Sequence, residues 1–402
     1  MRILRPAVGL AVASALIAAA GCGSSGGSGG SSSSGSGNAP IKLLVVSQLQ
    51  AASFAFPEIE DGARAAAESI NAAGGVNGHK IQIDACNDQG DPNVAGTCAR
   101  TAVQKKYSGV IMTVELYSAS VLPLLEAAKI PAVGNVPLTA PDFTSPESFP
   151  LSGGNPVDYG GIGFSAGKTG CKTASIIRDT QAAVDQSTAA MTRGARAAGL
   201  TIKATVRGAS TSADFSSAVS QIVSSGADCL LVAEPPTAVA KLVGTVRQSA
   251  KPAMPIYTAA VALPPPLVKA LGPAANGVIV DESVQLPSAT VTPQFWSDMT
   301  KYRPSAARST ASYQAWAAVQ IAKAAAGPAK AVTGPELTAA LNKASSVTVE
   351  GVAQTLNFSQ PQKSKDFARI FNTSIFAWKL NNGKYEPLFG GKAQDISSVL
   401  EG

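Results

Sequence analysis

The feature that most limits the fold of this chain is a repeated alternation of short apolar segments with longer amphipathic ones. Most of the apolar segments are too short for helices, and they suit strands that are buried on both faces. The amphipathic segments between them have helical periodicity. Strands separated by helices of about 10–15 residues form right-handed βαβ units and parallel, doubly wound sheets. Two consecutive series of this kind predict an α/β fold with two similar lobes.

The expected strands cover residues 41–47, 80–85, 109–113, 130–134, 171–178, 201–207, 228–233, 255–258 and 277–281. The expected helices cover residues 58–73, 93–106, 118–128, 157–168, 184–198, 214–225, 237–249 and 264–271. Ligands of such sheets bind beyond the carboxyl ends of the strands.

The N-terminus has the pattern of an export signal. Arg2 and Arg5 precede an uncharged apolar stretch, residues 6–20, which is shorter than the ~20 residues that span a bilayer. Small residues then lead directly to Cys22, as in the lipobox of bacterial lipoproteins, and only Gly and Ser follow over residues 23–37. We therefore expect a signal peptide at residues 1–21 and, at residues 22–39, a lipidated Cys22 with a flexible tether.

Composition excludes several classes of protein. The net charge is +6 over 402 residues, too dilute for a nucleic-acid interface. His79 is the only histidine, so a histidine-rich metal centre is impossible and a Ser-His-Asp site would need this one residue. We expect no catalytic residues, no metal site and no cofactor.

Export places the remaining four cysteines in an oxidising compartment, where they allow three pairings. Cys86 closes one expected strand and Cys98 lies on the helix that follows it. Cys171 and Cys229 each stand at the start of an expected strand, and neighbouring parallel strands would place these starts side by side. We predict the pairs 86–98 and 171–229.

Several short segments follow one another in a specific order and spacing: DGARAAAESIN (61–71), GGVNG (74–78), DACND (84–88), SASVLP (118–123), TAP (139–141), ADF (213–215) and GAD (226–228). The resulting resemblance is to periplasmic-type (class I) solute-binding proteins of the leucine/isoleucine/valine class, the receptor subunits of ABC importers. It runs from about Ile41 to near the C-terminus. It implies two α/β lobes that are joined by three crossing segments and close over a ligand.

The crossing segments are expected near residues 154–157, 281–286 and 351–358. The resulting first lobe comprises residues 40–154 plus 286–350, and the second lobe comprises residues 155–285 plus 351–402.

The resemblance also implies a ligand site. In the family, a hydroxyl and backbone amides at a helix N-terminus hold the ligand carboxylate, and Ser118 occupies that place. The alternative is that Ser118 only caps its helix. Thr139 matches a second hydroxyl contact, and Pro137 matches a position that contributes its carbonyl. Phe56 falls within about one residue of the family position whose aromatic ring walls the ligand side chain, and we expect Phe56 to take that role.

The second lobe departs from the family pattern. Ala182-Ala183 replace a tyrosine, and Thr258-Ala259-Ala260 replace the glutamate that binds a ligand ammonium. Glu234 is the nearest substitute carboxylate and Gln181 is a candidate hydrogen-bond donor, although Glu234 could equally be an exposed loop residue. The expected ligand is a small carboxylate-bearing solute, such as a branched-chain amino acid or a related organic acid, with an amide or urea-type solute as an alternative.

These features together predict a monomeric lipoprotein on the extracytoplasmic face of a bacterial cell membrane. It would deliver its small-molecule ligand to ABC permease subunits, and the lipid anchor would hold it at the membrane. The alternative is a ligand-binding sensor subunit that signals to a membrane receptor, because the same lobes serve both roles.

Overall fold

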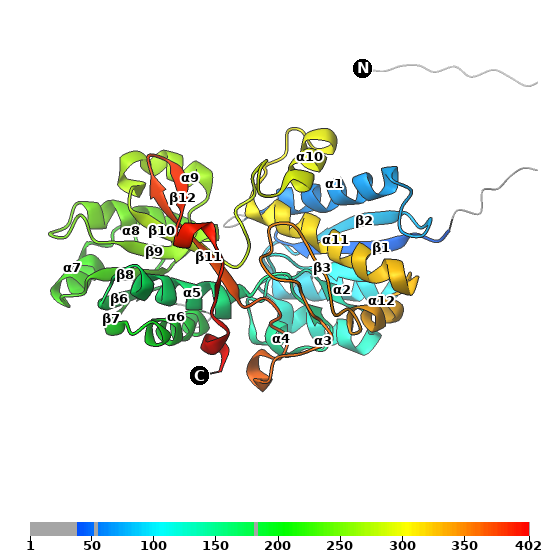
Figure 1. Ribbon diagram of the computed structural model, residues 1–402, viewed down its shortest axis with the longest axis horizontal. Helices are drawn as coiled ribbons and strands as arrows, with labels where there is room; N and C mark the ends of the chain where they lie inside the picture. The colour runs from blue at the N-terminus through cyan, green and yellow to red at the C-terminus, as the bar shows by residue number, and fades with distance from the viewer. Residues whose placement is uncertain (1–37, 52–54, 181–183, 402) are drawn as a thin grey trace, which may run out of the picture. The chain divides into compact units, whose positions relative to one another are not determined.

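The computed structural model describes residues 38–51, 55–180 and 184–401. The predicted signal peptide, Cys22, the tether and Gln181 lie outside the described residues. Within the described residues, the strands form one five-stranded and one eight-stranded sheet, and helices cover both faces of each sheet (Figure 1). This arrangement confirms the predicted α/β class with two parallel-dominated sheets.

The first sheet is parallel throughout and has the strand order β2-β1-β3-β4-β5. Its elements are β1 (Ile41–Ser47), α1 (Glu58–Ala72), β2 (Ile81–Asn87), α2 (Pro92–Gln104), β3 (Gly109–Ile111), α3 (Ser118–Ala128), β4 (Ala132–Val133), α4 (Ala140–Thr144) and β5 (Ser148–Phe149). The sequence pattern did not predict the short elements α4 and β5. Later in the chain, α10 (Pro293–Tyr302), α11 (Thr310–Ala329) and α12 (Gly334–Leu341) return to this lobe.

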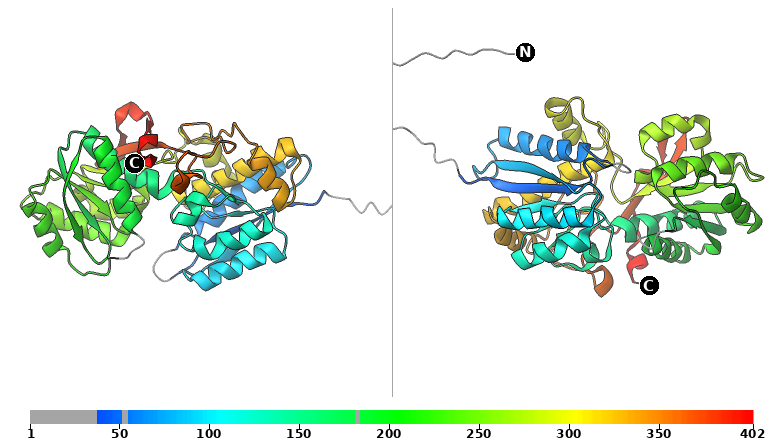
Figure 2. Two further views of the ribbon diagram at one scale, coloured as in Figure 1. Left: turned by 90° about the horizontal axis from the view of Figure 1, so that it is seen from below. Right: turned by 180° about the vertical axis from the view of Figure 1, so that it is seen from behind.

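Side-chain alternation along β1 explains why this sheet is covered on both faces. Leu43 and Val45 belong to a core with α1 and α11, whereas Leu44 and Val46 belong to a second core with α2 and α3. Figure 2 shows the first sheet between these two helix layers. Because both faces are apolar, the lobe can place polar chemistry only at the strand ends and loops.

The second sheet has the order β12-β11-β10-β9-β8-β6-β7, and β13 pairs with β11. Its elements are α5 (Gly154–Lys168), β6 (Thr173–Arg178), α6 (Asp185–Ala197), β7 (Thr201–Arg207), α7 (Ser216–Ser224), β8 (Cys229–Ala233), α8 (Pro236–Arg247), β9 (Ile256–Ala259), α9 (Pro265–Leu271), β10 (Val278–Glu282), β11 (Ser374–Asn381), β12 (Lys384–Pro387) and β13 (Gln394–Asp395). Strands β6 to β10 are parallel, and the C-terminal strands, which the sequence pattern did not predict, add an antiparallel edge.

Three chain segments connect the two lobes, and hydrogen bonds tie these segments to one another. The backbone amide of Gly153 donates to Ser283 Oγ (3.0 Å). The side-chain amide of Asn372 donates to the carbonyls of Leu151 (3.3 Å) and Ser283 (2.9 Å). Asn372 therefore bridges the other two crossing segments, and its own segment is the third.

The third crossing differs from the one expected at residues 351–358. Leu356, Phe358 and Phe371 are buried in the core of the first lobe. The Phe358 ring makes edge-on contacts with Phe149 and Phe371, at centroid distances of 5.7 and 5.0 Å. Because these aromatic contacts hold residues 351–371 on the first lobe, the chain crosses only between Phe371 and the start of β11.

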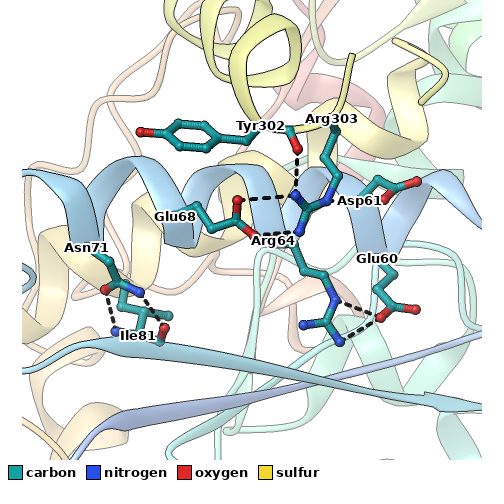
Figure 3. A network of polar contacts seen from close by, with 8 residues as sticks. All are labelled: Glu60, Asp61, Arg64, Glu68, Asn71, Ile81, Tyr302 and Arg303. Atoms are coloured by element: carbon teal, nitrogen blue, oxygen red, sulfur yellow. Dashed lines mark hydrogen bonds and ion pairs between the residues drawn. The ribbon is translucent and has the colours of Figure 1, made fainter. Parts of the chain in front are cut away.

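The segment at residues 61–71 lies on α1, and several of its residues fix this helix to its neighbours (Figure 3). Asp61 forms an ion pair with Arg303, which follows α10 (3.4 Å). A Cβ atom at Gly62 would lie 2.0 Å from the carbonyl oxygen of Ser312, so only glycine allows α11 to approach this closely. The Asn71 side chain both accepts from and donates to the Ile81 backbone at 2.8 Å, and it thereby fixes the edge strand β2 to α1.

Both predicted disulfides are present. Cys86 on β2 is bonded to Cys98 on α2, and Cys171 is bonded to Cys229. Strands β6 and β8 are parallel neighbours with Ala174 opposite Cys229, which brings the two strand starts together as expected. No helix in the described ranges is long and apolar enough to cross a membrane.

Removing either disulfide should destabilise the protein, and the longer loop should cost more. The bonded residues are 12 and 58 positions apart, so chain entropy predicts losses of about 3 and about 4 kcal/mol. Urea unfolding of Cys86→Ser/Cys98→Ser and Cys171→Ser/Cys229→Ser variants measures both losses. Peptide mapping that found other pairs in the parent protein would contradict the assignment.

Candidate functional site

Buried polar side chains gather where the first-lobe strands end. We define the first-lobe cluster as Gln48, Asp88, Glu115, Ser118, Thr139 and Asp142. These residues follow β1, β2, β3 and β4, and they include the first residue of α3 and the start of α4. All except the half-buried Thr139 are at most 4% exposed. Parallel strands bring their carboxyl ends to one edge, which is where this fold class binds ligands.

Two carboxyls of this cluster interact directly. Glu115 accepts a hydrogen bond from the backbone amide of Tyr117 (2.6 Å), and Asp88 accepts one from the amide of Gly90 (2.8 Å). Burial, followed by the hydrogen bond with the Asp88 carboxyl and its charge, raises the pKa of Glu115 to about 9. The pair therefore holds a proton at neutral pH.

The two hydroxyls predicted to bind a ligand are brought together around Asp142. The Thr139 hydroxyl and backbone amide donate to the Asp142 carboxylate at 3.0 and 2.9 Å, forming the cap of α4. The Ser118 hydroxyl also hydrogen bonds this carboxylate and lies 3.4 Å from the carbonyl of Glu115. Burial raises the pKa of Asp142 to about 6 despite these hydrogen bonds.

Pro137 contacts the first crossing segment, and Phe56 packs within the first lobe. The Pro137 carbonyl accepts from the backbone amide of Asn155 (2.8 Å) at the first crossing segment. A Cβ atom at Gly154 would lie 2.0 Å from this carbonyl oxygen, and Gly154 has φ +55°, so only glycine fits there. Phe56 packs on the first-lobe core, and its backbone amide donates to the carbonyl of Gln48 (2.8 Å).

A second set of acidic groups lies at the carboxyl ends of the second-lobe strands. Glu234 follows β8 directly and is 4% exposed, which excludes the exposed-loop alternative. Neither of its carboxyl oxygens has a hydrogen-bond partner within the described part of the chain. Burial, followed by the charge of Asp179, raises the pKa of Glu234 to about 8, although Arg178 opposes this shift.

Acidic groups also lie at the start of α5 and the end of β10, around Tyr159. The charges of Asp158, Glu282 and Glu234 all contribute to the raised pKa of Tyr159, which is about 12 and is caused mainly by burial. Asp158 accepts from the backbone amide of Ser283 (2.8 Å), which places this carboxyl at the second crossing segment.

Sequence reasoning identified Ser118, Thr139 and Glu234 as site candidates but missed the other carboxyls of both sets. The available signal was position, because Asp88 and Glu115 lie at most four residues beyond a buried strand. No group of three or more His, Cys, Asp or Glu side chains among the described residues could hold a metal ion.

Exposed apolar side chains lie near the same strand ends. Leu116 follows β3 and is 49% exposed, and Val261 follows β9 and is 43% exposed. Two open cavities of about 740 Å³ lie elsewhere: one beside the edge strand β2 and α2, the other among residues that include Pro255, before β9, and Gly277, before β10. Neither cavity is lined by a residue of the first-lobe cluster or by Glu234.

Replacing Glu234 by Gln should increase stability at high pH. A carboxyl with a raised folded-state pKa stabilises the protein below its unfolded value of 4.5, and this contribution is lost as pH rises toward about 8. The neutral amide avoids this loss, so Glu234→Gln should be more stable than the parent by roughly 1–3 kcal/mol at pH 8 and equal to it at pH 4.

Thermal unfolding at pH 4, 6 and 8 measures this difference. Glu336→Gln is the control of opposite sign, because hydrogen bonds from Thr333 and Val332 lower the pKa of Glu336. That variant should be less stable than the parent at pH 8. A parent-like pH dependence for Glu234→Gln would contradict the ionisation assigned to Glu234.

Solved structures with the same fold come from several bacteria. A substrate-binding periplasmic protein from Ralstonia solanacearum is 18% identical with a TM-score of 0.73, covering 86% of this chain and 99% of the other. A fatty acid ABC transporter substrate-binding protein from Thermomonospora curvata is 18% identical with a TM-score of 0.73, covering 90% and 94%.

A branched-chain amino acid transporter substrate binding protein from Streptococcus pneumoniae, solved in complex with isoleucine, is 18% identical with a TM-score of 0.72, covering 89% of this chain and 99% of the other. No curated protein sequence matches the chain. The family model described as "Periplasmic binding protein" matches residues 41–374, which include all three crossing segments and both lobes up to the start of β11. The chain therefore belongs to the periplasmic binding protein family.

Proposed function

We propose that this solute-binding protein captures a small organic solute between its lobes and delivers it to the permease subunits of an ABC importer. The observation that carries the proposal is the gathering of buried polar groups at the carboxyl ends of both sheets. Several of their atoms lack hydrogen-bond partners within the described chain, including Gln48 Oε1 and both carboxyl oxygens of Glu234. Buried polar atoms of this kind are costly unless a partner satisfies them, and a bound solute would be that partner.

The proposed solute carries a carboxylate, as in a branched-chain amino acid or a related organic acid. Ser118 is the first residue of α3, and within the described residues no side chain caps this helix, which supports an anion at its N-terminus. One similar structure holds isoleucine and another is a fatty acid ABC transporter substrate-binding protein, and isoleucine and fatty acids both carry a carboxylate. Leu116 and Val261 would cover an apolar part of the solute.

A thermal-shift screen of small organic acids, amino acids and amides against the purified protein tests this function. A solute at 100 times its Kd adds about 2.7 kcal/mol to the free energy of unfolding. We expect at least one carboxylate-bearing compound to raise the melting temperature. A panel in which no compound of any charge does so would overturn the proposal.

Substitution at Ser118 or Thr139 should weaken binding of the compound that the screen identifies. Hydrogen bonds to charged groups contribute about 1.5–3 kcal/mol, so each Ala substitution should raise the Kd roughly 10- to 150-fold. The structure does not show Ser118 capping α3, since its hydroxyl bonds Asp142 instead. If the two hydroxyls only hold Asp142 at the start of α4, each substitution costs about 1 kcal/mol of stability and leaves the Kd unchanged.

Titration calorimetry separates these outcomes, and thermal unfolding measures the stability term in parallel. Ser120→Ala is the matched control for Ser118, because Ser120 lies in the same helical turn but beside Gly96 of α2. Thr144→Ala is the control for Thr139, since the exposed Thr144 hydroxyl bonds only within α4 (3.2 Å). Parent-like affinities for both Ser118→Ala and Thr139→Ala would refute the site.

We also propose that lipid on Cys22 anchors the protein at the extracytoplasmic face of the membrane. The support is the sequence pattern, in which small residues precede Cys22 and a Gly/Ser segment follows it. Cys22→Ala should move the protein from the membrane to the soluble fraction while its melting temperature stays the same. Ser24→Ala, two residues further along, should remain with the membrane, and a membrane-bound Cys22→Ala variant would exclude the anchor.

A further inference from the structure

The local sequence explains why the buried Glu234 carboxyl lacks partners. Glu234 is the first residue after β8, Pro235 caps α8, and Pro236 is the first residue of this helix. A helix N-terminus normally presents backbone amides to a nearby carboxylate, but proline has no N–H group. The two residues after Glu234 therefore offer no backbone donor, and both carboxyl oxygens remain unsatisfied within the described chain.

The charged groups around Glu234 do not neutralise it either. Arg178, at the end of β6, forms an ion pair with Asp185 of α6, and its Nε donates to the Asp179 carbonyl (2.9 Å). Asp179 is itself a carboxylate whose charge raises the pKa of Glu234. The β6 end therefore presents one cation, which is already paired with a carboxylate, and one further acid.

Further acids lie on α5 and β10, around Tyr159. Burial, followed by the charges of Asp158, Glu282 and Glu234, raises the pKa of Tyr159 of α5. Burial raises the pKa of Glu282 well above its ordinary value, and burial raises the pKa of Asp158 to about 7. Glu282 is therefore largely neutral at pH 7 and Asp158 only partly ionised, so burial and the Asp179 charge are what favour the neutral form of Glu234.

We propose that Glu234 is the counter-charge for a positively charged nitrogen group of the solute, and that it releases its proton to solvent when this group binds. This inference rests on the proposed function and specifies the solute class as one that carries an amine, amidine or guanidine group. The protonated carboxyl and the cation form a carboxylate–cation pair, and one proton passes to bulk water. The N–H groups of the cation satisfy the carboxyl oxygens that the Pro-Pro sequence leaves unpaired.

Four probes with the same apolar part separate the charge types: leucine, 3-methylbutylamine, 4-methylpentanoate and 4-methylpentanamide. Arginine, agmatine and benzamidine extend the cationic set. We expect stabilisation by at least one cationic or zwitterionic probe, with 4-methylpentanoate and 4-methylpentanamide binding at least tenfold more weakly. Thermal shift at pH 7 ranks the probes, and titration calorimetry gives the Kd of those that bind.

Calorimetry in phosphate and in Tris, which differ in ionisation enthalpy, counts the protons that binding releases. Because the pKa of Glu234 is about 8, we expect close to one proton released at pH 7 and almost none at pH 9.5. The Kd of the cationic probe should fall about tenfold per pH unit between pH 5.5 and 7.5 and level off above pH 8. Zero release or proton uptake at pH 7 would overturn the proposal.

Glu234→Gln isolates this residue from the neighbouring acids. The variant should bind the cationic probe at least tenfold more weakly, with no proton release and no slope in Kd against pH. Glu147→Gln is the matched control, because burial also raises the pKa of Glu147. Glu147 lies before β5, away from the carboxyl ends of the strands, and its carboxylate accepts a hydrogen bond from Thr338. This control should bind and release protons like the parent, and its stability should be checked in parallel.

A measurement on the parent protein covers the case in which Glu234→Gln folds poorly. In the infrared difference spectrum at pH 7, the cationic probe should remove the neutral carboxyl absorption of about one group, while the absorption of other buried acids such as Glu115 and Glu282 persists. Tight binding of 4-methylpentanoate or 4-methylpentanamide without any cationic probe would overturn this inference and leave the proposed function standing. A panel in which nothing binds would overturn both.

Discussion

The covering of each parallel sheet on both faces is the constraint from which the other features of this protein follow. Two parallel neighbouring strands can be connected only by a crossover, which is usually a helix that packs on a face of the sheet. In the first sheet, α1 and α11 pack on one face and α2 and α3 on the other. Apolar side chains then fill both faces, and polar groups are confined to the strand ends. Because parallel strands share one direction, their carboxyl ends meet, and residues as distant in sequence as Gln48 and Asp142 form one cluster.

The electrostatics of these strand ends follow from burial more than from direct pairing. The largest cause of the raised pKa of Glu115, Asp142 and Glu234 is desolvation, and neighbouring acids add to it for Glu115 and Glu234. At neutral pH, Glu115 and Glu234 therefore hold protons and need no counter-ions. A solute that supplies N–H groups and positive charge would exchange with these protons, whereas a carboxylate would depend on backbone amides and hydroxyls.

The connections between the lobes are held by a few specific contacts. Asn372 bridges the carbonyls of Leu151 and Ser283, and the positive φ of Gly154 allows the first crossing segment to pass against Pro137. Asp158 accepts from the Ser283 amide at the same place, so the second crossing segment is bonded to a carboxyl that also influences Tyr159. Asp158 thus belongs to the second-lobe acids and is also hydrogen bonded to a crossing segment.

The sequence by itself determined the α/β class, the order of most strands and helices, and both disulfides, because hydrophobic periodicity and strand direction are local properties that limit which ends can meet. It also placed Ser118, Thr139 and Glu234 after strands. Only the tertiary structure decided that Asp142 lies between the two hydroxyls, that Glu115 faces Asp88, and that residues 351–371 stay on the first lobe. These features depend on packing between segments far apart in the chain, and no local pattern encodes the burial that sets their charge states.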